Sequence, residues 1–233
     1  MKGREFVDQM RRRVVLAGPA RRIVSLVPSQ TELLFDLGAG DRVVGVTDFC
    51  TEPHHMPAHV QRIGGTKRFL LDRIEALAPD LIIGNHEENY REGIEALAAR
   101  FPVWMSDILG LDDALAMIRA VGELVDAKPR ADALADAIAA GFSALDTAAR
   151  IPVAYLIWRK PWMAAGTRTF IHEMLQQGGF DNVFADRERY PECMLGEIRE
   201  RAPQAVLLSS EPFPFGEEHL REVEAALPGV RVL

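Results

Sequence analysis

Residues 22–34 read RIVSLVPSQTELL, and this stretch decides the fold class. Its first six residues are rich in β-branched side chains and predict a buried strand, which Pro28 ends because proline cannot donate to a strand ladder. Ser29 and Glu32 have the spacing of a capping box, so we expect a helix to follow directly. A second apolar strand comes at 43–46. Strand, helix and strand in this order predict a parallel crossover unit.

The same alternation extends over most of the chain, with one long helical interruption. Up to residue 105 the pattern predicts helices at 71–77 and 94–99 and strands at 81–83 and 102–105. Between 111 and 149 the apolar residues fall at helical spacing, which predicts helices 111–126 and 129–149. From 153 onward we expect strands 153–158, 205–209 and 230–233 and helices 169–177, 196–201 and 217–226.

A weak internal sequence repeat supports two similar lobes. Residues 73–83 align without gaps to residues 197–207, and both segments read as a helix that an Ala-Pro pair closes before a buried strand. The expected fold class is therefore α/β, with two Rossmann-like lobes of mostly parallel sheet joined by a single long backbone helix. The expected boundaries are an N-terminal extension at 1–20, an N-terminal lobe at 21–127, the connecting helix at 128–150 and a C-terminal lobe at 151–233.

Composition excludes several classes of protein. The net charge of −7 argues against non-specific nucleic-acid binding, which depends on lysines and arginines that neutralise phosphates. Cys50 and Cys193 lie too far apart in sequence to indicate a thiolate zinc site, and two free thiols are expected. No GxSxG, P-loop or GxGxxG motif is present, so we expect a protein that is not an enzyme and requires no cofactor.

The N-terminal residues indicate where the chain resides. Only a four-residue apolar run, 14–17, follows the arginines at 11–13, which is too short for the apolar region of a secretory signal. No run approaches the length of a membrane span. We therefore expect a cytoplasmic monomer without a membrane span, or a periplasmic protein if the true start lies upstream.

Several segments together resemble one protein family. They are 22–34, 78–83, the central helices, 155–159, 182–186, 189–192 and 209–215. The chain resembles, over about residues 21–233, the helical-backbone substrate-binding proteins of ABC importers, and within them the helical backbone metal receptors near the cobalamin binders. This resemblance implies a two-lobed clamp that binds a metal chelate in the cleft between its lobes: a cobalamin-like corrinoid, a ferric siderophore or haem. The chain stops where the family resemblance implies a further aromatic loop and helix, so the C-terminal lobe is either truncated or minimal.

Candidate ligand-binding residues follow from the geometry of parallel sheets. Ligands bind beyond the carboxyl ends of the strands, where loops present side chains on a rigid scaffold. Trp162 is the better candidate for stacking on a flat ligand, because Trp158 lies in an apolar strand. Arg159 has the geometry to bind an anion, with a surface ion pair as an equally good interpretation. The full set is Ser29, Gln30, Thr31, Phe49, Cys50, Asn85, His86, Glu87, Arg159, Trp162, Ser210 and Glu211.

Two clusters offer weak candidates for a directly bound metal ion. His86 is followed by Glu87 and Glu88, which also fit the solvated first turn of a helix. His54, His55 and His59 form the second cluster, but Pro53 and Pro57 make the helix that would align them doubtful. Direct metal-ion binding is therefore an alternative function, and a cytosolic metabolite sensor or enzyme that reuses the clamp is another.

The family resemblance also implies a permease as partner. In importer-bound members an acidic residue on each lobe docks onto the membrane permease. The matching position is Asp72 in the first lobe and Gly196 in the second, where Glu197 is adjacent. We therefore expect docking at Asp72 and Glu197, with the second position departing from the family pattern.

Overall fold

The computed structural model describes residues 3–145, 147 and 149–233. The chain divides into two compact units: unit 1 comprises residues 1–108 and 112–139, and unit 2 comprises residues 109–111 and 140–233. Each unit contains a sheet with parallel strands and flanking helices, which confirms the expected α/β class. Within the described residues, no helix combines the length and the apolar character that a membrane span requires.

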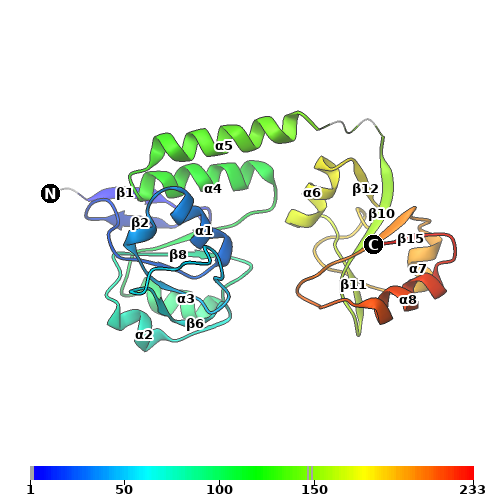
Figure 1. The fold of residues 1–233 in the computed structure, drawn as a ribbon, viewed down its shortest axis with the longest axis horizontal. Coiled ribbons are helices and arrows are strands. Elements are labelled where there is room, and N and C mark those ends of the chain that lie inside the picture. Colours follow the sequence, from blue (N-terminus) through cyan, green and yellow to red (C-terminus); the bar gives the residue numbers. More distant parts are fainter. Residues whose placement is uncertain (1–2, 146, 148) are drawn as a thin grey trace. The chain divides into compact units, whose positions relative to one another are not determined.

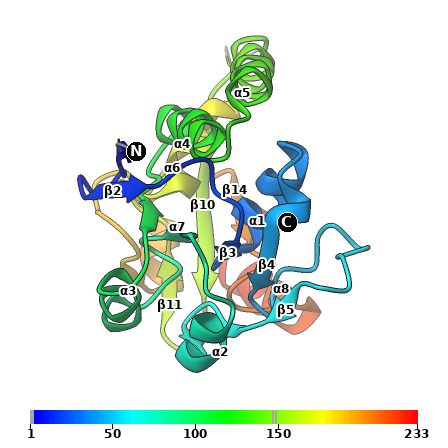
Figure 2. The same ribbon diagram turned by 90° about the vertical axis from the view of Figure 1, so that its left-hand side faces the viewer.

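Unit 1 is built on a five-stranded sheet in which all neighbouring strands are parallel. In spatial order the strands are β5 (Gln61–Arg62), β4 (Val43–Val46), β3 (Ile23–Ser25), β8 (Leu81–Asn85) and β9 (Val103–Ser106). The helices are α1 (Pro28–Asp36), the 3-10 turn η1 (Gly40–Arg42), α2 (Leu71–Ala76), α3 (Arg91–Ala98), α4 (Leu111–Leu124) and most of α5 (Lys128–Ser143). Figures 1 and 2 show α4 and α5 on the side of the sheet opposite α2 and α3.

The central strand of unit 1 confirms the strand expected from the opening stretch, but the expected capping box is wrong. All three residues of β3 are buried, as expected of a strand covered by helices on both faces. Helix α1 begins at Pro28, with Val27 as N-cap and no side-chain cap. Proline is well suited to the first helical position because its fixed φ is already helical. Ser29 therefore lies inside the first turn and does not cap the helix.

Helices α4 and α5 pack closely along one side of unit 1. Gly122 of α4 makes this approach possible, because a Cβ there would lie 2.2 Å from the Cβ of Ala131 in α5. Arg119 of α4 adds ion pairs to Asp136 at 2.6 Å and Asp132 at 3.8 Å. Small buried residues and cross-helix charges thus hold the pair together.

The expected helix 129–149 is wrong in its last third, because α5 ends at Ser143. Leu145 continues the apolar spacing but is 49% exposed, so it gains little from burial. Residues 144, 145, 147, 149 and 150 are not helical, and residues 146 and 148 lie outside the described residues. At about 1.5 Å per residue, the sixteen residues of α5 reach about 24 Å.

The N-terminal residues form a hairpin that the sequence did not indicate. Strands β1 (Arg4–Val7) and β2 (Arg13–Leu16) are antiparallel. Their connecting loop binds edge strand β9, since the backbone N–H of Gln9 donates to Met105 O at 3.1 Å. The buried Asp8 carboxylate accepts the Met105 N–H at 3.2 Å and pairs with Arg12 at 2.7 Å. The hairpin therefore covers part of an otherwise open sheet edge.

Unit 2 has a six-stranded mixed sheet centred on β10 (Ile151–Trp158). Strands β12 (Phe180–Asn182) and β14 (Ala205–Leu208) pair with β10 in parallel, and β15 (Arg231–Val232) pairs in parallel with β14. Strands β11 (Trp162–Ala164) and β13 (Glu192–Cys193) form an antiparallel margin. The helices are α6 (Phe170–Gln177), α7 (Leu195–Glu200) and α8 (Glu217–Ala226).

The internal sequence repeat, residues 73–83 and 197–207, corresponds to the same local structure in both units. Ala78 and Ala202, which follow α2 and α7, both adopt positive φ, at 43° and 50°. In each unit the residue after the following proline donates its N–H toward the neighbouring strand: Asp80 to Arg22 O at 3.0 Å and Gln204 to Pro152 O at 2.8 Å. The gap-free alignment therefore marks equivalent helix-to-strand connections.

Candidate functional site

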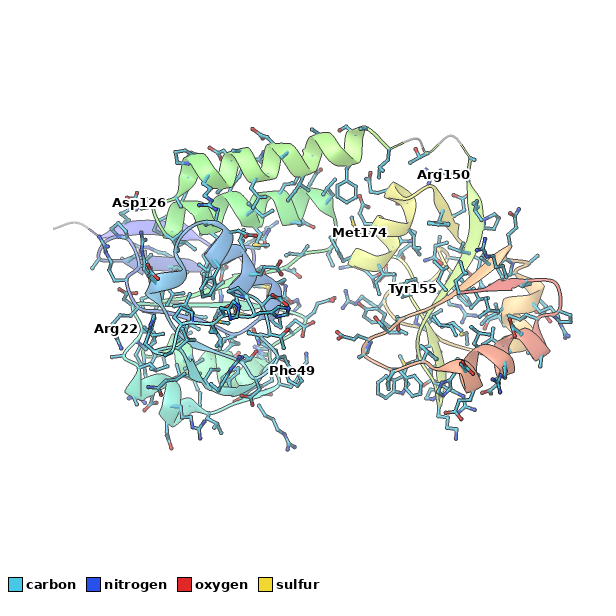
Figure 3. All side chains as sticks on the ribbon, in the orientation of Figure 1. Arg22, Phe49, Asp126, Arg150, Tyr155 and Met174 are labelled. Atoms are coloured by element: carbon cyan, nitrogen blue, oxygen red, sulfur yellow. The ribbon has the colours of Figure 1, made fainter. Side chains whose placement is uncertain are left out.

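The carboxyl end of the unit 1 sheet collects most of the predicted residues of the N-terminal half. Arg22, before β3, and Phe49, after β4, are labelled in Figure 3 and lie at opposite ends of this sheet. The loops after β3, β4, β8 and β9 all leave from the end marked by Phe49, because the four strands are parallel. The sheet topology thus brings these loops to one edge of unit 1.

A buried polar network lies under this edge. Gln30 Nε2 donates to Ser106 Oγ at 2.6 Å, and Asn85 Nδ2 donates to the same oxygen at 2.9 Å. Ser106 Oγ in turn donates to Gly84 O at 3.2 Å. Asn85 Oδ1 accepts the backbone N–H of Glu87 at 2.8 Å, which fixes the loop that follows β8. Sequence reasoning missed Ser106, which joins the loops after β3, β8 and β9.

A second buried group surrounds Cys50. Thr31 Oγ1 lies 3.2 Å from the Cys50 sulfur and donates to Val27 O at 3.0 Å, while Thr47 Oγ1 also lies 3.2 Å from that sulfur. We had expected Gln30, Thr31 and Cys50 to be accessible loop residues. Their side chains are instead buried beneath the edge. Their hydrogen bonds hold the loops in place, because a buried polar side chain is stable only when it is bonded.

The exposed rim of unit 1 has a different composition. Phe49 is 63% exposed, and His86 Nδ1 lies 3.2 Å from Asp107 Oδ1. Ser29 and Glu88 are also exposed, and Glu87 is half-buried. Lys67, at the turn between β6 (Gly64–Gly65) and β7 (Arg68–Phe69), donates to the Glu87 carbonyl. This hairpin was not expected, because its strands have only two residues each. The rim combines one aromatic ring with charged groups of both signs.

Neither candidate metal cluster is assembled. Among the residues that the structure describes, no three His, Cys, Asp or Glu side chains converge as metal ligands. His54 Nδ1 instead lies 2.8 Å from Glu52 Oε1, and His59 Nε2 lies 3.1 Å from Val43 O. Residues 51–60 form no helix, so His55 and His59 do not share a helical face. The direct metal-ion interpretation of these histidines and of His86, Glu87 and Glu88 is not supported.

Unit 2 presents an aromatic wall where β10 and β14 end. The wall consists of Trp158, Trp162, Phe213, Phe215 and His219. Trp158 meets Phe213 edge-on at 5.4 Å between ring centroids, and Trp162 stacks on Phe215 at 5.9 Å with only 4° between the planes. Phe213 and Phe215 touch each other at 4.7 Å. Such ring pairs stabilise an arrangement beyond the area that they bury.

The two tryptophans differ from the sequence expectation in their exposure. Trp158 ends β10 and is 38% exposed, so it is not a core residue. Trp162 packs against the unit 2 core, stacks on Phe215 and has the Arg159 guanidinium 5.6 Å from its ring centroid. Trp158 is therefore the more accessible ring for a flat ligand.

The polar candidates of unit 2 differ in whether they are already paired within the protein or exposed to solvent. Arg159 forms two bonds to Glu222 Oε2, from Nε at 2.7 Å and from Nη2 at 2.6 Å, as the ion-pair interpretation predicted. Ser210 and Glu211 are exposed on the loop after β14. The neighbouring Ser209 is buried, and its hydroxyl has no hydrogen-bond partner among the described residues. Ser210 and Glu211 are thus the predicted polar residues that remain accessible on this loop.

Comparison with known proteins identifies the family. A family model described as periplasmic binding protein matches residues 23–226, which is most of the chain. The chain belongs to this family. The vitamin B12-binding protein of Vibrio parahaemolyticus is 24% identical over 197 residues, covering 82% of this chain and 71% of that protein.

Solved structures agree on the fold of this periplasmic binding protein. A possible iron-binding periplasmic solute-binding protein from Staphylococcus epidermidis matches with a TM-score of 0.78 at 21% identity, covering 91% of this chain and 85% of that one. The periplasmic haem-binding protein HutB of Vibrio cholerae matches with a TM-score of 0.77 at 21% identity, covering 91% and 88%. At these identities the likeness concerns the fold.

The two predicted permease-docking residues of this periplasmic binding protein have unequal surroundings. Asp72 is exposed in the first turn of α2. Glu197 is instead bound by two arginines of its own unit, Arg187 at 2.6 Å and Arg201 at 3.1 Å. Gly196 is exposed, and a Cβ there would meet no atom within 4 Å. The second position thus offers space for an acidic side chain that the sequence does not supply.

Proposed function

We propose that this periplasmic binding protein is the substrate-binding component of an ABC-type importer, and that it binds a metal chelate without catalysing its conversion. The ligand classes are a cobalamin-like corrinoid, a ferric siderophore or haem. The observation that carries the proposal is the aromatic wall of unit 2, with Trp158 exposed at the carboxyl end of β10. Family membership supports it, as do relatives named for vitamin B12, iron and haem.

The chemistry of the two edges suits a flat chelate. Corrin and porphyrin rings have broad apolar faces, which aromatic side chains bind by stacking, and polar groups at their periphery. Trp158 supplies an accessible ring on unit 2, and Phe49 supplies one on unit 1. The rim around Phe49 adds the ammonium of Lys67 and the His86–Asp107 pair, which can bind peripheral carboxylate or amide groups.

Titration with cyanocobalamin, haemin and ferrichrome, followed by absorbance and calorimetry, tests the proposal. We expect one chelate to bind at micromolar concentration or tighter. Trp158→Ala should weaken that binding roughly tenfold, because it removes the exposed stacking surface of the aromatic wall. Phe170→Ala is the matched control: Phe170 is also 38% exposed but lies on α6, outside the aromatic wall. If none of the chelates binds at tens of micromolar, or if the control variant loses as much affinity, the proposal fails.

We further propose that a permease docks at Asp72 and at the exposed N-terminal turn of α7. Asp72 has no competing ion pair among the described residues, whereas Glu197 is already paired with arginines. Asp72→Asn should therefore reduce stimulation of a permease ATPase more than Glu197→Gln does. Gly196→Glu should increase stimulation, since a side chain there points into open space. Equal effects of Asp72→Asn and Glu197→Gln would contradict this assignment.

The family to which the chain belongs favours the periplasmic alternative for its location. Fractionation of native cells, with antibody detection in the periplasmic extract, tests this part of the proposal. Recovery of the protein in the cytoplasmic fraction alone would refute it and would favour a cytosolic sensor.

A further inference from the structure

His219 lies at the centre of the aromatic wall and also at the start of α8. It is buried at the third residue of the helix, and its ring meets Phe213 edge-on at 5.1 Å and Phe215 at 5.6 Å. The ring Nδ1 accepts the backbone N–H of Gly216 at 3.0 Å, and the backbone N–H of His219 donates to Gly216 O at 3.0 Å. These reciprocal bonds close the loop between β14 and α8.

The bond to Gly216 fixes the protonation state of the imidazole. A backbone N–H can only donate, so Nδ1 must be unprotonated to accept from it, and the neutral ring carries its proton on Nε2. When the imidazole is charged, both ring nitrogens carry protons and the bond to Gly216 is lost. The positive charge would then also lie in the first turn of a helix, where the macrodipole disfavours cations.

We infer that neutral His219 is the positioning residue of the aromatic wall and makes the wall sensitive to pH. The His219 ring holds Phe213 and Phe215, which in turn contact Trp158 and Trp162. Protonation of the ring therefore releases the loop at Gly216 and shifts the rings that the tryptophans touch. The wall itself is a feature of the structure, and only the effect on ligand affinity rests on the proposed function.

Most of the acidic residues near His219 on α8 form ion pairs with arginines and not with the His219 ring. On α8, Glu218 Oε1 lies 3.6 Å from His219 Nε2 and favours the charged ring. Glu217 pairs with Arg221 at 2.7 Å, and Glu222 pairs with Arg159 of the β10–β11 turn. Glu211 on the loop after β14 and Lys160 on the β10–β11 turn are exposed, and so are Arg199 and Glu200 of α7 and Arg231 of β15, the elements that pack against α8. Among the described residues, the carboxylate that lies within ion-pair distance of the His219 ring is that of Glu218. Its side chain is exposed, so solvent and salt screen its charge.

Three variants separate positioning from simple burial. Gln at the third helical position can accept the N-cap N–H and does not titrate, so His219→Gln keeps the bond at every pH. His219→Leu fills the space without an acceptor. His172→Gln is the control: His172 belongs to the same unit and its Nδ1 lies 3.2 Å from Asn182 Nδ2, but it is part of α6 and not of the aromatic wall.

The experiment records tryptophan emission and histidine ring ¹⁵N shifts of the full chain between pH 8 and pH 5. In the native protein we expect the Nε2–H tautomer of His219 at pH 8 and a shift in emission maximum that follows its protonation. His172→Gln should keep this shift, His219→Gln should abolish it, and His219→Leu should show the low-pH emission throughout. An Nδ1–H tautomer at pH 8, a pH-independent native emission, or an unchanged profile in His219→Gln would overturn the inference.

Ligand affinity provides a separate measurement. The chelate that binds in the titration should bind about three- to tenfold more weakly at pH 5 than at pH 8, and this ratio should be near one in His219→Gln. If no chelate binds, the proposed function fails while the emission and ¹⁵N data still decide the role of His219. A chelate that binds with the same pH ratio in both proteins would contradict the positioning role.

Discussion

Replacement of Ser106 by alanine removes the atom that joins three loops under the candidate edge of unit 1. Ser106 Oγ is fully buried, accepts the amide groups of Gln30 and Asn85 at 2.6 and 2.9 Å, and donates to Gly84 O at 3.2 Å. Alanine fits the space, because it is smaller than serine and keeps the same backbone. The substitution therefore tests the hydrogen bonds and not the packing.

The expected cost follows from the three lost bonds. A typical buried hydrogen bond contributes about 1 kcal/mol net, and an amide that keeps no acceptor adds a desolvation penalty of about 1–3 kcal/mol. Gln30 Nε2 retains a second acceptor, Gly84 O at 3.3 Å, so Asn85 is the side chain left without its acceptor in this network. We therefore expect the free energy of unfolding to fall by about 2–4 kcal/mol, and Tm by roughly 5–15 °C.

Urea and thermal unfolding, followed by circular dichroism, measure the effect. Ser209→Ala is the matched control, because Ser209 is equally a buried serine at a strand end but its hydroxyl has no partner among the described residues. This second substitution should not destabilise the protein, because it removes a buried hydroxyl that makes no hydrogen bond among the described residues. If Ser106→Ala costs no more than Ser209→Ala, the network does not hold the edge of unit 1 and the reasoning is refuted.

Four further measurements test other parts of the structure. Gly122→Ala should lower the free energy of unfolding by more than 1 kcal/mol although alanine favours helix, because the new Cβ would lie 2.2 Å from that of Ala131; a stabilised variant in urea unfolding would contradict this. Thr169→Ala should cost about 1–2 kcal/mol in the same assay, since Thr169 Oγ1 caps α6 by accepting the His172 N–H at 3.1 Å, and an unchanged midpoint would exclude that role. Burial raises the pKa of the Cys193 thiol to about 11, aided by the nearby carboxylate of Glu197, so iodoacetamide should modify Cys193 at pH 8 much more slowly in the folded protein than in urea. Because the unfolded thiol ionises first, stability should also be lost as the pH rises from about 9 to about 11, and Cys193→Ala should remove that part of the loss.

The sequence predicted the elements that rest on strong local patterns. Strand 43–46 and helix 217–226 were predicted with their observed bounds, because apolar runs and amphipathic spacing report burial directly. Helix 129–149 was too long because its spacing continued past the residues that gain from packing. The hairpins β1–β2 and β6–β7 were missed because their strands are short and, unlike the fully buried strand 43–46, are partly or largely exposed, so they carry little apolar pattern.

For the candidate site, sequence order located the loops but not the direction of their side chains. Gln30, Thr31 and Cys50 follow strand ends as expected, yet they are buried and hydrogen-bonded inside unit 1. Trp158 is more exposed than its apolar strand predicted, because it lies at the end of that strand, whereas Trp162 packs on Phe215. A strand end predicts a location, whereas exposure depends on what packs beside it.

The stretch from Arg22 to Val46 by itself determined that this protein contains a parallel crossover unit, because β-branched runs, proline and helical spacing act locally. Tertiary structure alone decided which polar side chains serve as internal supports and which aromatic rings remain accessible. Ser106 and His219 carry no sequence motif. Ser106 joins segments that lie far apart in the chain, and His219 contacts Phe213 and Phe215, which in turn meet Trp158 and Trp162 of a distant segment. Their importance arises from burial and from hydrogen bonds and ring contacts that form only when those segments meet.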